Sequence, residues 1–200
     1  MSRVTSQSRD ERTTEFAKAA APALSADVLR HAYGMFPSGV TAVCALMDEV
    51  PVGIAASSFT SVSIDPPLVS VCVGHSSATW PLLRSLPRLG ISVLAEDHVD
   101  IVRQIASKTG DRFANVDWEA GAGEAVFVHG ATLWLNCQIE DEIRAGDHDI
   151  VVLRVEELTP YPDASPMVFH ASKFRQLGVE PNLTTPWWLV PGLDSVDGMC

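Results

Sequence analysis

The sequence lacks the short motifs that identify the commonest nucleotide-binding and metal-dependent enzymes. It contains no G-x-G-x-x-G, no Walker lysine loop, no G-x-S-x-G and no H-E-x-x-H. Without the first of these, a nicotinamide nucleotide would have to bind without the Rossmann phosphate loop. The six histidines are scattered along the chain, so a metal cluster would have to assemble from distant segments. We therefore expect no metal site.

Cysteine is scarce and widely spaced. The four cysteines stand at positions 44, 72, 137 and 200, with no C-x-x-C pair among them. Cys44, Cys72 and Cys137 lie inside apolar runs, which is typical of unpaired thiols buried in a core. This pattern fits a reducing compartment, so we expect a cytoplasmic protein.

Long apolar runs and positive charge are scarce as well. No run approaches the roughly 20 apolar residues that span a bilayer. The chain has 14 Lys and Arg against 25 Asp and Glu, a formal net charge of −11. An acidic surface repels nucleic-acid phosphates and anionic lipids, so we expect no nucleic acid and no membrane as a partner. Residues 1–24 lack the apolar segment of a secretory signal, and we expect them to form a disordered lead-in.

The chain is rich in short, β-branched apolar runs separated by turn signals. The predicted strands cover residues 40–47, 52–56, 68–73, 91–94, 131–139 and 150–155. Residues 132–140 alternate between apolar and other side chains, which predicts a sheet with two different faces. Periodicity at 79–86 and 97–107, and after an N-cap at Ser25, predicts three short helices. The pattern favours a mainly β fold, a barrel with a few short helices, over a doubly wound α/β fold.

The composition changes after the predicted domain, which covers residues 25–178. Residues 179–200 form a tail that contains three prolines and the pair Trp187–Trp188. Adjacent tryptophans in a Pro-rich segment usually need a surface to pack on. We expect this tail to dock on its own domain or on a sister subunit, with a free tail as the alternative.

A cluster of hydroxyl side chains lies between two predicted strands. Five of the seven residues from 57 to 63 are Ser or Thr, and Asp65-Pro66-Pro67 follows them. Hydroxyls and consecutive backbone N–H groups at a strand-to-turn junction form a concave donor surface that suits a phosphate. The alternative is a Ser-rich surface turn that ends in a proline breaker. Composition alone leaves both interpretations open.

Two further places are candidate sites. Gly146-Asp147-His148 is predicted to be a hairpin turn, and it would present His148 at a pocket rim to contact a carboxamide or move a proton. Lys108, Arg112 and Phe113 follow a predicted helix and form a candidate anion clamp, because positive charge is scarce elsewhere in the chain. The alternative in both places is an ordinary solvent-exposed side chain.

Five segments occur in an order and at spacings that belong together. They are FPSGVTAV (36–43), GIAASSFTSVSIDPPLVSVCV (53–73), the pair Arg112-Phe113, LNCQIEDEIRAGDHDIVVLRV (135–155) and FHASKFRQL (169–177). In this arrangement the chain resembles the flavin reductase family, the FMN-binding split-barrel proteins that supply reduced flavin to two-component monooxygenases. The resemblance runs from about residue 27 to residue 177. It implies a six-stranded Greek-key split barrel that forms a homodimer.

The resemblance also implies residues for the site. His148 falls on the histidine of the family's G-D-H motif, beside the nicotinamide, and is the implied catalytic residue. Cys44 stands where the family commonly has Thr, and a thiol is a weaker hydrogen-bond partner than a hydroxyl. The residues implied to bind the cofactor are Gly39, Val40, Ala56, Ser57, Ser58, Thr60, Ser61, Ser63, Arg112, Phe113, Phe169, His170 and Arg175.

The activity implied by the resemblance is that of an NAD(P)H:flavin oxidoreductase. It would use FMN or FAD with NADH or NADPH, and would pass reduced flavin to a partner monooxygenase. The alternatives are a flavin-binding protein without reductase activity, and a related split-barrel protein that binds haem or a pyridoxal-type phosphate. The sequence contains no motif that chooses between the two flavins or between the two nucleotides.

Overall fold

The computed structural model describes residues 24–178. The predicted tail at 179–200 and all of the predicted lead-in except Leu24 lie outside this range. The fold is mainly β with a few short helices, as predicted. The described elements, in chain order, are α1 (Ala26–Tyr33), β1 (Ser38–Gly39), β2 (Thr41–Met47), β3 (Val50–Ala56), β4 (Thr60–Ser63), β5 (Leu68–Gly74), α2 (Trp80–Leu83), β6 (Leu89–Val93), α3 (Val99–Ile105), β7 (Trp118–Ala120), a 3₁₀ turn (Ala122–Glu124), β8 (Val126–Val128), β9 (Leu133–Ala145), β10 (His148–Pro160), β11 (Val168–His170) and β12 (Lys173–Arg175).

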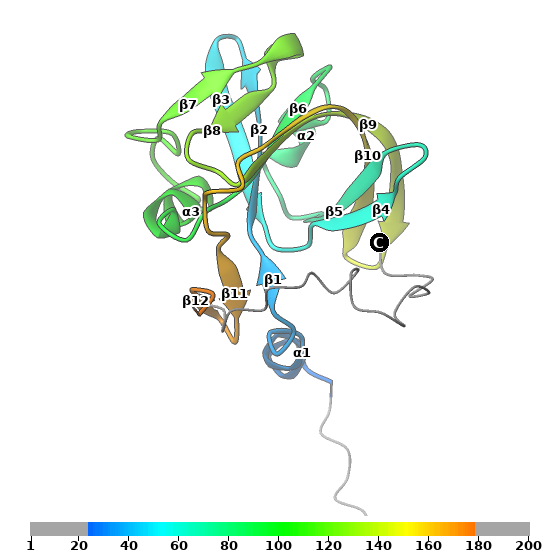
Figure 1. Cartoon of the computed structure of the whole chain (residues 1–200). Coiled ribbons are helices and arrows are strands. Elements are labelled where there is room, and N and C mark those ends of the chain that lie inside the picture. Colours follow the sequence, from blue (N-terminus) through cyan, green and yellow to red (C-terminus); the bar gives the residue numbers. More distant parts are fainter. Residues whose placement is uncertain (1–23, 179–200) are drawn as a thin grey trace, which may run out of the picture.

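The strands form three antiparallel sheets. The largest has seven strands in the order β3-β2-β6-β9-β10-β5-β4, and the others have the orders β1-β11-β12 and β7-β8. Figure 1 shows the large sheet coiled, with β9 and β10 bending strongly along their length. The prediction of six strands was therefore wrong, because twelve strands lie in sheets within residues 24–178 and no closed six-stranded barrel is formed.

The strands that were not predicted have no apolar–polar alternation by which the sequence could reveal them. Strands β7, β8, β11 and β12 have three residues each and β1 has two, which is too short to show a period of two. Strand β4 consists largely of hydroxyl residues, for which the sequence left open a phosphate-binding strand-to-turn junction and a Ser-rich surface turn. Strands β9 and β10 run to 13 residues each, longer than predicted. Strand β9 continues beyond residue 139 as exposed, largely polar chain toward the hairpin turn, and β10 continues beyond residue 155, where its exposed end pairs with the first residues of β9.

Side-chain alternation divides the core between the two faces of the large sheet. Val43 and Ala45 of β2 join one apolar cluster, while Ala42 and Cys44 join the other. The alternation predicted for β9 is confirmed, since Leu135 and Cys137 lie in the first cluster. On the opposite face, Trp134 of β9 stacks on Phe127 of β8 with ring centroids 5.1 Å apart. Both faces of the sheet are thus covered at β2 and β9.

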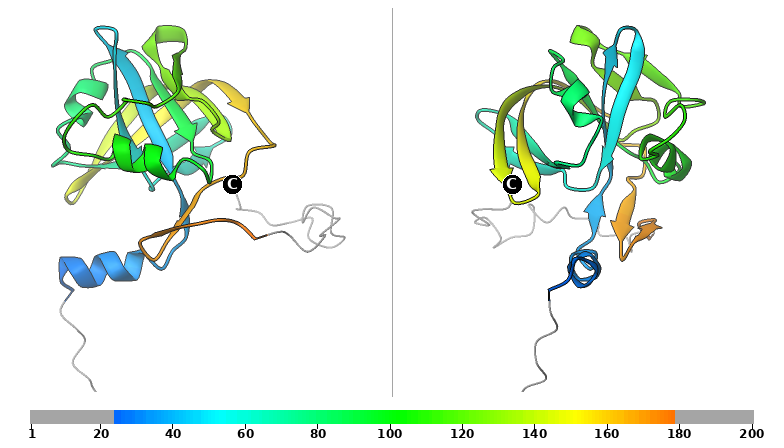
Figure 2. Two further views of the ribbon diagram at one scale, coloured as in Figure 1. Left: turned by 90° about the vertical axis from the view of Figure 1, so that its left-hand side faces the viewer. Right: turned by 180° about the vertical axis from the view of Figure 1, so that it is seen from behind.

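The three helices differ in how they are attached. The N-cap predicted for α1 is confirmed, because the Ser25 hydroxyl accepts a hydrogen bond from Val28 N at 3.4 Å. Helix α2 buries Trp80 and Leu83, and α3 buries Val102 and Ile105, whereas α1 buries no residue. Figure 2 shows α1 projecting from the rest of the molecule.

None of the helices described between residues 24 and 178 has the length and apolarity that a membrane crossing needs.

Candidate active site

A pocket of about 640 Å³ lies where four parts of the chain meet. The first part is the end of β3 with the turn that follows it, and the second is the end of β5 with the loop leading to α2. The third is the end of α3 with its following loop, and the fourth is the start of β10. The residues that line the pocket are Ile54, Ala55, Ala56, Ser57, Ser58, Cys72, Val73, Gly74, Ser76, Ser77, Ala78, Thr79, Ile105, Ala106, Lys108, Arg112 and His148.

Strand β5 places one cysteine in this pocket. Val69, Val71 and Val73 point into the core, so Cys72 points to the opposite side, where it is exposed and lines the pocket. The Ser58 hydroxyl accepts a hydrogen bond from Cys72 N at 2.9 Å and donates one to Cys72 O at 3.2 Å. Ser58 therefore holds the turn after β3 against β5. The expectation that Cys72 is a buried core thiol was wrong, because its strand is covered only on the valine face.

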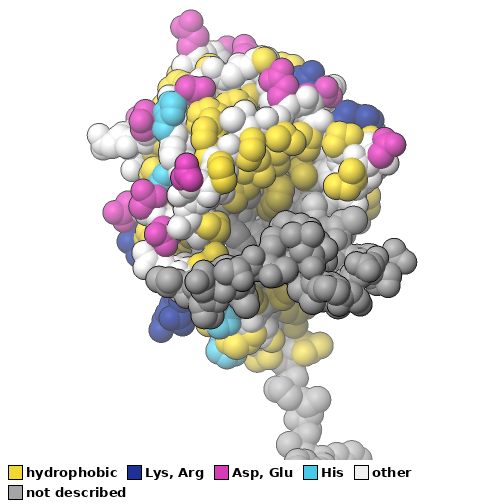
Figure 3. Space-filling model, in the orientation of Figure 1, with side chains coloured by type: hydrophobic (Ala, Val, Ile, Leu, Met, Phe, Trp, Pro, Cys, Tyr) yellow, Lys and Arg dark blue, Asp and Glu magenta, His cyan; other side chains and the backbone are white. Residues whose placement is uncertain are grey.

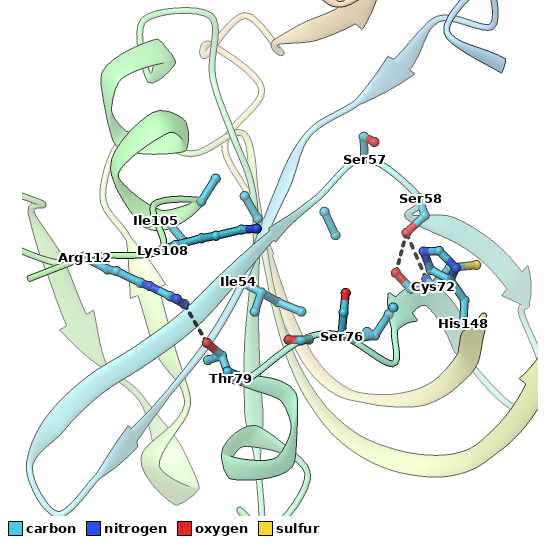
Figure 4. Close-up of a pocket in the computed structure, with 17 residues that line it drawn as sticks. Ile54, Ser57, Ser58, Cys72, Ser76, Thr79, Ile105, Lys108, Arg112 and His148 are labelled. Carbon is cyan, nitrogen blue, oxygen red and sulfur yellow. Dashed lines mark hydrogen bonds between the residues drawn. The ribbon is translucent and has the colours of Figure 1, made fainter. Parts of the chain in front are cut away.

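Arg112 connects two walls of the pocket. Its Nη1 donates to Gly53 O at 3.2 Å and to Thr79 Oγ1 at 2.6 Å, which ties β3 to the loop before α2 (Figure 4). Lys108 extends toward the middle of the pocket in the same view. Among the residues that line the pocket, these two are the only cations. Arg112 Nη1 is thus held by protein groups, whereas no hydrogen bond or ion pair within residues 24–178 fixes the Lys108 ammonium, so Lys108 is the cation that can move to meet a ligand.

His148 stands on the opposite side of the pocket from Lys108 and Arg112, beside Cys72 and Ser58 (Figure 4). It pairs with Gly74 across β10 and β5, and a Cβ atom built on Gly74 would lie 3.4 Å from His148 Nε2. A glycine here leaves the space next to the imidazole open.

A carboxylate orients the His148 ring. His148 Nδ1 lies 2.8 Å from Asp147 Oδ1, and this hydrogen bond lowers the pKa of the Asp147 carboxyl. An ionised carboxylate only accepts hydrogen bonds, so Nδ1 must carry the proton. In the neutral imidazole, Nε2 is then an acceptor that a ligand N–H can reach.

The pocket collects six of the site residues that the sequence singled out. Ala56, Ser57, Ser58, Lys108, Arg112 and His148 all line it. Thr60, Ser61 and Ser63 lie next to this group on β4 and do not line the pocket. Phe113 is buried, and its ring lies 3.0 Å from a Cβ built on Gly53, in the core behind β3.

The remaining predicted residues lie in or beside the small three-stranded sheet, not in the pocket. Gly39 pairs with Val168 between β1 and β11, and Val40, which follows β1, is buried in the second core cluster. Phe169 packs on Phe174 with ring centroids 5.4 Å apart. His170 and Arg175 belong to β11 and β12. Cys44 is fully buried and does not line the pocket.

Sequence reasoning missed the wall formed by Ser76, Ser77 and Thr79. These hydroxyls lie in the segment GHSSAT, which directly follows the predicted strand 68–73. The signal was present, since this segment repeats the arrangement of Ser57 and Ser58 after the strand before it. Two clusters of hydroxyls, each following a strand, indicate two walls of one polar pocket.

The lining fits a flavin. Ile54, Ala55 and Ala56 offer an apolar surface for a flat ring system, and Gly74 adds no side chain on the opposite wall. Hydroxyls and the Lys108 ammonium suit a phosphate group. The volume is within the usual range for a cofactor pocket, roughly 300–1,000 Å³.

The fold and the pocket together define the class: a mainly β protein that binds an organic cofactor. The sequence model of the family described as flavin reductase like domain matches residues 33–178. The chain therefore belongs to this family, as the sequence motifs indicated.

Relatives and solved structures agree with this assignment. HsaB, the reductase subunit of a flavin-dependent monooxygenase of Mycobacterium tuberculosis, is 32% identical over 159 residues, which cover 78% of this chain and 84% of HsaB. The NADH:FAD oxidoreductase SgcE6 of Streptomyces globisporus, solved with NAD and FAD fragments, is 36% identical with a TM-score of 0.73, over 76% of this chain and 93% of SgcE6. BorF, the flavin reductase component of a bacterial two-component tryptophan halogenase, is 32% identical with a TM-score of 0.71, over 78% of this chain and all of BorF.

The described thiols should differ sharply in reactivity. Burial raises the pKa of the Cys137 thiol to about 12 and that of Cys44 well above its ordinary value, so both stay protonated at pH 8. In a Cys200→Ser protein we expect one fast-reacting thiol, Cys72, when the folded protein is titrated with a disulfide reagent. Adding Cys72→Ser should remove the fast phase. Fast reaction of a second thiol in the folded protein would contradict the burial of Cys44 and Cys137.

Proposed function

We propose that this protein is an NAD(P)H:flavin oxidoreductase that reduces FMN or FAD and supplies the reduced flavin to a partner monooxygenase. The observation that carries the proposal is the 640 Å³ pocket, with a free cation on one side and His148 on the other. Family membership supports it, because HsaB is a monooxygenase reductase subunit and SgcE6 an NADH:FAD oxidoreductase. The free thiols of Cys44, Cys72 and Cys137 fit a cytoplasmic location.

The phosphate of the flavin is proposed to bind beside Lys108 and Ser57. The Lys108 ammonium extends into the pocket there, whereas Arg112 is held in place by the bonds of its Nη1 to Gly53 and Thr79. Ser57 and Ser76 make no hydrogen bond to the other residues drawn in Figure 4, so their hydroxyls remain free to donate to phosphate or to the ring edge. Among the other cofactor residues implied by the resemblance, those on β4 and on the small sheet stay candidates for contacts outside this pocket.

His148 is proposed to bind the nicotinamide. Its Nε2, an acceptor in the neutral ring, is suited to the N–H of a carboxamide, and Asp147 holds the ring in that orientation. When bound, the flavin supplies the ring that takes up a hydride from the reduced nicotinamide. The work of the protein is then to hold two flat rings in contact at a productive orientation. This task needs no strong general base, in agreement with the residues that line the pocket.

A steady-state assay tests the proposal directly. We expect oxidation of NADH or NADPH to depend on added FMN or FAD, because the chain transfers electrons between two bound substrates. Measuring all four combinations identifies the preferred pair. Purified protein without flavin-dependent oxidation of either nucleotide would disprove reductase activity. If flavin still slowed the labelling of Cys72 in that case, the chain would be a flavin-binding protein without reductase activity.

Two substitutions should separate the two ligands. Lys108→Gln should raise KM for FMN about tenfold through loss of a charge-assisted hydrogen bond, and should leave KM for riboflavin, which has no phosphate, nearly unchanged. His148→Ala should raise KM for the nucleotide about three- to tenfold, since one neutral hydrogen bond is lost, while the flavin Kd stays unchanged.

The control for these substitutions is Arg103→Gln on α3, an exposed cation that does not line the pocket. It should alter neither constant. An equal effect of Lys108→Gln on FMN and riboflavin would show that Lys108 does not bind the phosphate. Loss of flavin binding in His148→Ala would place His148 at the flavin instead.

A homodimer is proposed because α1 and the segment after it leave apolar side chains uncovered. Tyr33 is 72% exposed and Phe36 77% exposed, and α1 buries no residue against the described chain. Figure 3 shows apolar side chains gathered around α1 at the base of the molecule. A helix of eight residues is too short to be stable alone, since isolated helices need about 12–15 residues. A second copy that covers this face would stabilise it.

Sedimentation equilibrium tests the dimer. The wild-type protein should have twice the mass of the 21.5 kDa chain at micromolar concentration. Replacing both Tyr33 and Phe36 by Glu should shift it toward the monomer, because two charges would then be buried in the interface. A monomeric wild-type protein would rule out the dimer, and a dimeric double variant would exclude this face as the interface.

A further inference from the structure

The wall of the pocket between β5 and α2 contains little regular structure of its own. Residues 75–79 follow the last residue of β5 and precede the first residue of α2. Four of these residues, Ser76, Ser77, Ala78 and Thr79, line the pocket. Their position therefore depends on what holds the two ends of the segment.

The β9–β10 hairpin holds the first end. His75 N donates to Asp147 O at 3.0 Å, and His75 Nε2 lies 2.8 Å from Asp149 Oδ1. Both partners flank His148, the hairpin residue that lines the pocket on the opposite side. At this end, the wall and His148 are fixed to the same short piece of chain.

The same hairpin holds the second end, through Glu142 of β9. Glu142 Oε1 accepts a hydrogen bond from Trp80 Nε1 at 2.9 Å, and Glu142 Oε2 accepts one from Arg84 Nη2 at 2.5 Å. Trp80 is the first residue of α2, is 4% exposed and packs in the first core cluster. The Glu142 side chain is 19% exposed and Trp80 is buried, so water weakens the Trp80 bond less than it weakens a surface ion pair, whereas the Arg84 side chain is 52% exposed and its bond is closer to a surface pair.

We infer that Glu142 is a positioning residue of the pocket: its carboxylate fixes the start of α2, and with it the Ser76–Thr79 wall, relative to the hairpin that carries His148. The change in KM for flavin that we expect from this role rests on the proposed function. Glu142 does not line the pocket and touches no proposed ligand. It acts through Trp80 and Arg84.

The hairpin offers a matched control. Glu140, two residues earlier on the same strand, accepts hydrogen bonds from Arg154 Nε at 2.9 Å and Nη2 at 2.6 Å. This pair has the same kinds of charged group, but both side chains are 39% exposed and neither lines the pocket. Glu140→Gln therefore removes a charge from the hairpin without releasing α2.

Kinetics and amide hydrogen exchange of the full chain test the inference. Glu142→Ala should raise KM for flavin about tenfold, since two charge-assisted hydrogen bonds are lost, and should speed exchange at residues 76–80. Glu142→Gln, whose amide oxygen still accepts the Trp80 N–H, should give a smaller effect. Glu140→Gln should change neither quantity. A lower melting temperature in Glu142→Ala with unchanged KM and exchange would overturn the inference, as would an equal effect of Glu140→Gln.

A double-mutant cycle with Trp80→Phe tests the route through the indole. This substitution keeps an aromatic ring and removes the N–H donor, so adding Glu142→Ala to it should raise KM by less than Glu142→Ala does in the wild-type background. Full additivity would overturn the route through Trp80. Absence of flavin-dependent turnover in the wild-type protein would disprove the proposed function, and the exchange comparison would still decide whether Glu142 positions the wall.

Discussion

The pairing of β10 with β5 is the constraint on which the pocket depends. The register runs from His148 opposite Gly74 to Arg154 opposite Leu68. A shift of one residue would turn the core valines of β5 outward and would separate His148 from Gly74, because side chains alternate along a strand. The register of the β9–β10 hairpin is set by its two-residue turn, in which Gly146 adopts a φ of +67°. The position of His148 thus follows from a backbone conformation that glycine adopts without strain.

Around this hairpin, the other pocket walls are held by side-chain hydrogen bonds rather than by further strands. Ser58 joins the turn after β3 to β5, Arg112 joins β3 to Thr79, and Glu142 joins β9 to α2. Each bond links segments that are far apart in the sequence. Polar residues near the pocket therefore have two kinds of task, since some hold walls together and others face the space that a ligand would fill. Arg112 and Lys108 illustrate the difference.

The sequence predicted the parts of the fold that have a repeating pattern. The six apolar runs all became strands of the large sheet, and the alternation in β9 predicted its two faces. The three-residue strands escaped prediction because no period can be recognised in three residues. Arg112 and Phe113 were treated as one unit, yet Arg112 reaches the pocket and Phe113 is buried in the core. The side chains of adjacent residues point in different directions, so the backbone conformation decides which of the two contacts a ligand.

The balance of charge in the pocket bears on how tightly an anion would be held. The chain has a net charge of −11, and the residues that line the pocket include two cations, of which Arg112 is held in place through its Nη1 by Gly53 and Thr79. A planar guanidinium suits that fixed role, whereas the lysine ammonium is a compact charge on a flexible stem. A phosphate held by one ammonium and neutral hydroxyls is bound less tightly than one clamped by several arginines. Under the proposed function, the reduced flavin has to leave for a partner enzyme, and a weak phosphate site in an acidic protein favours that release.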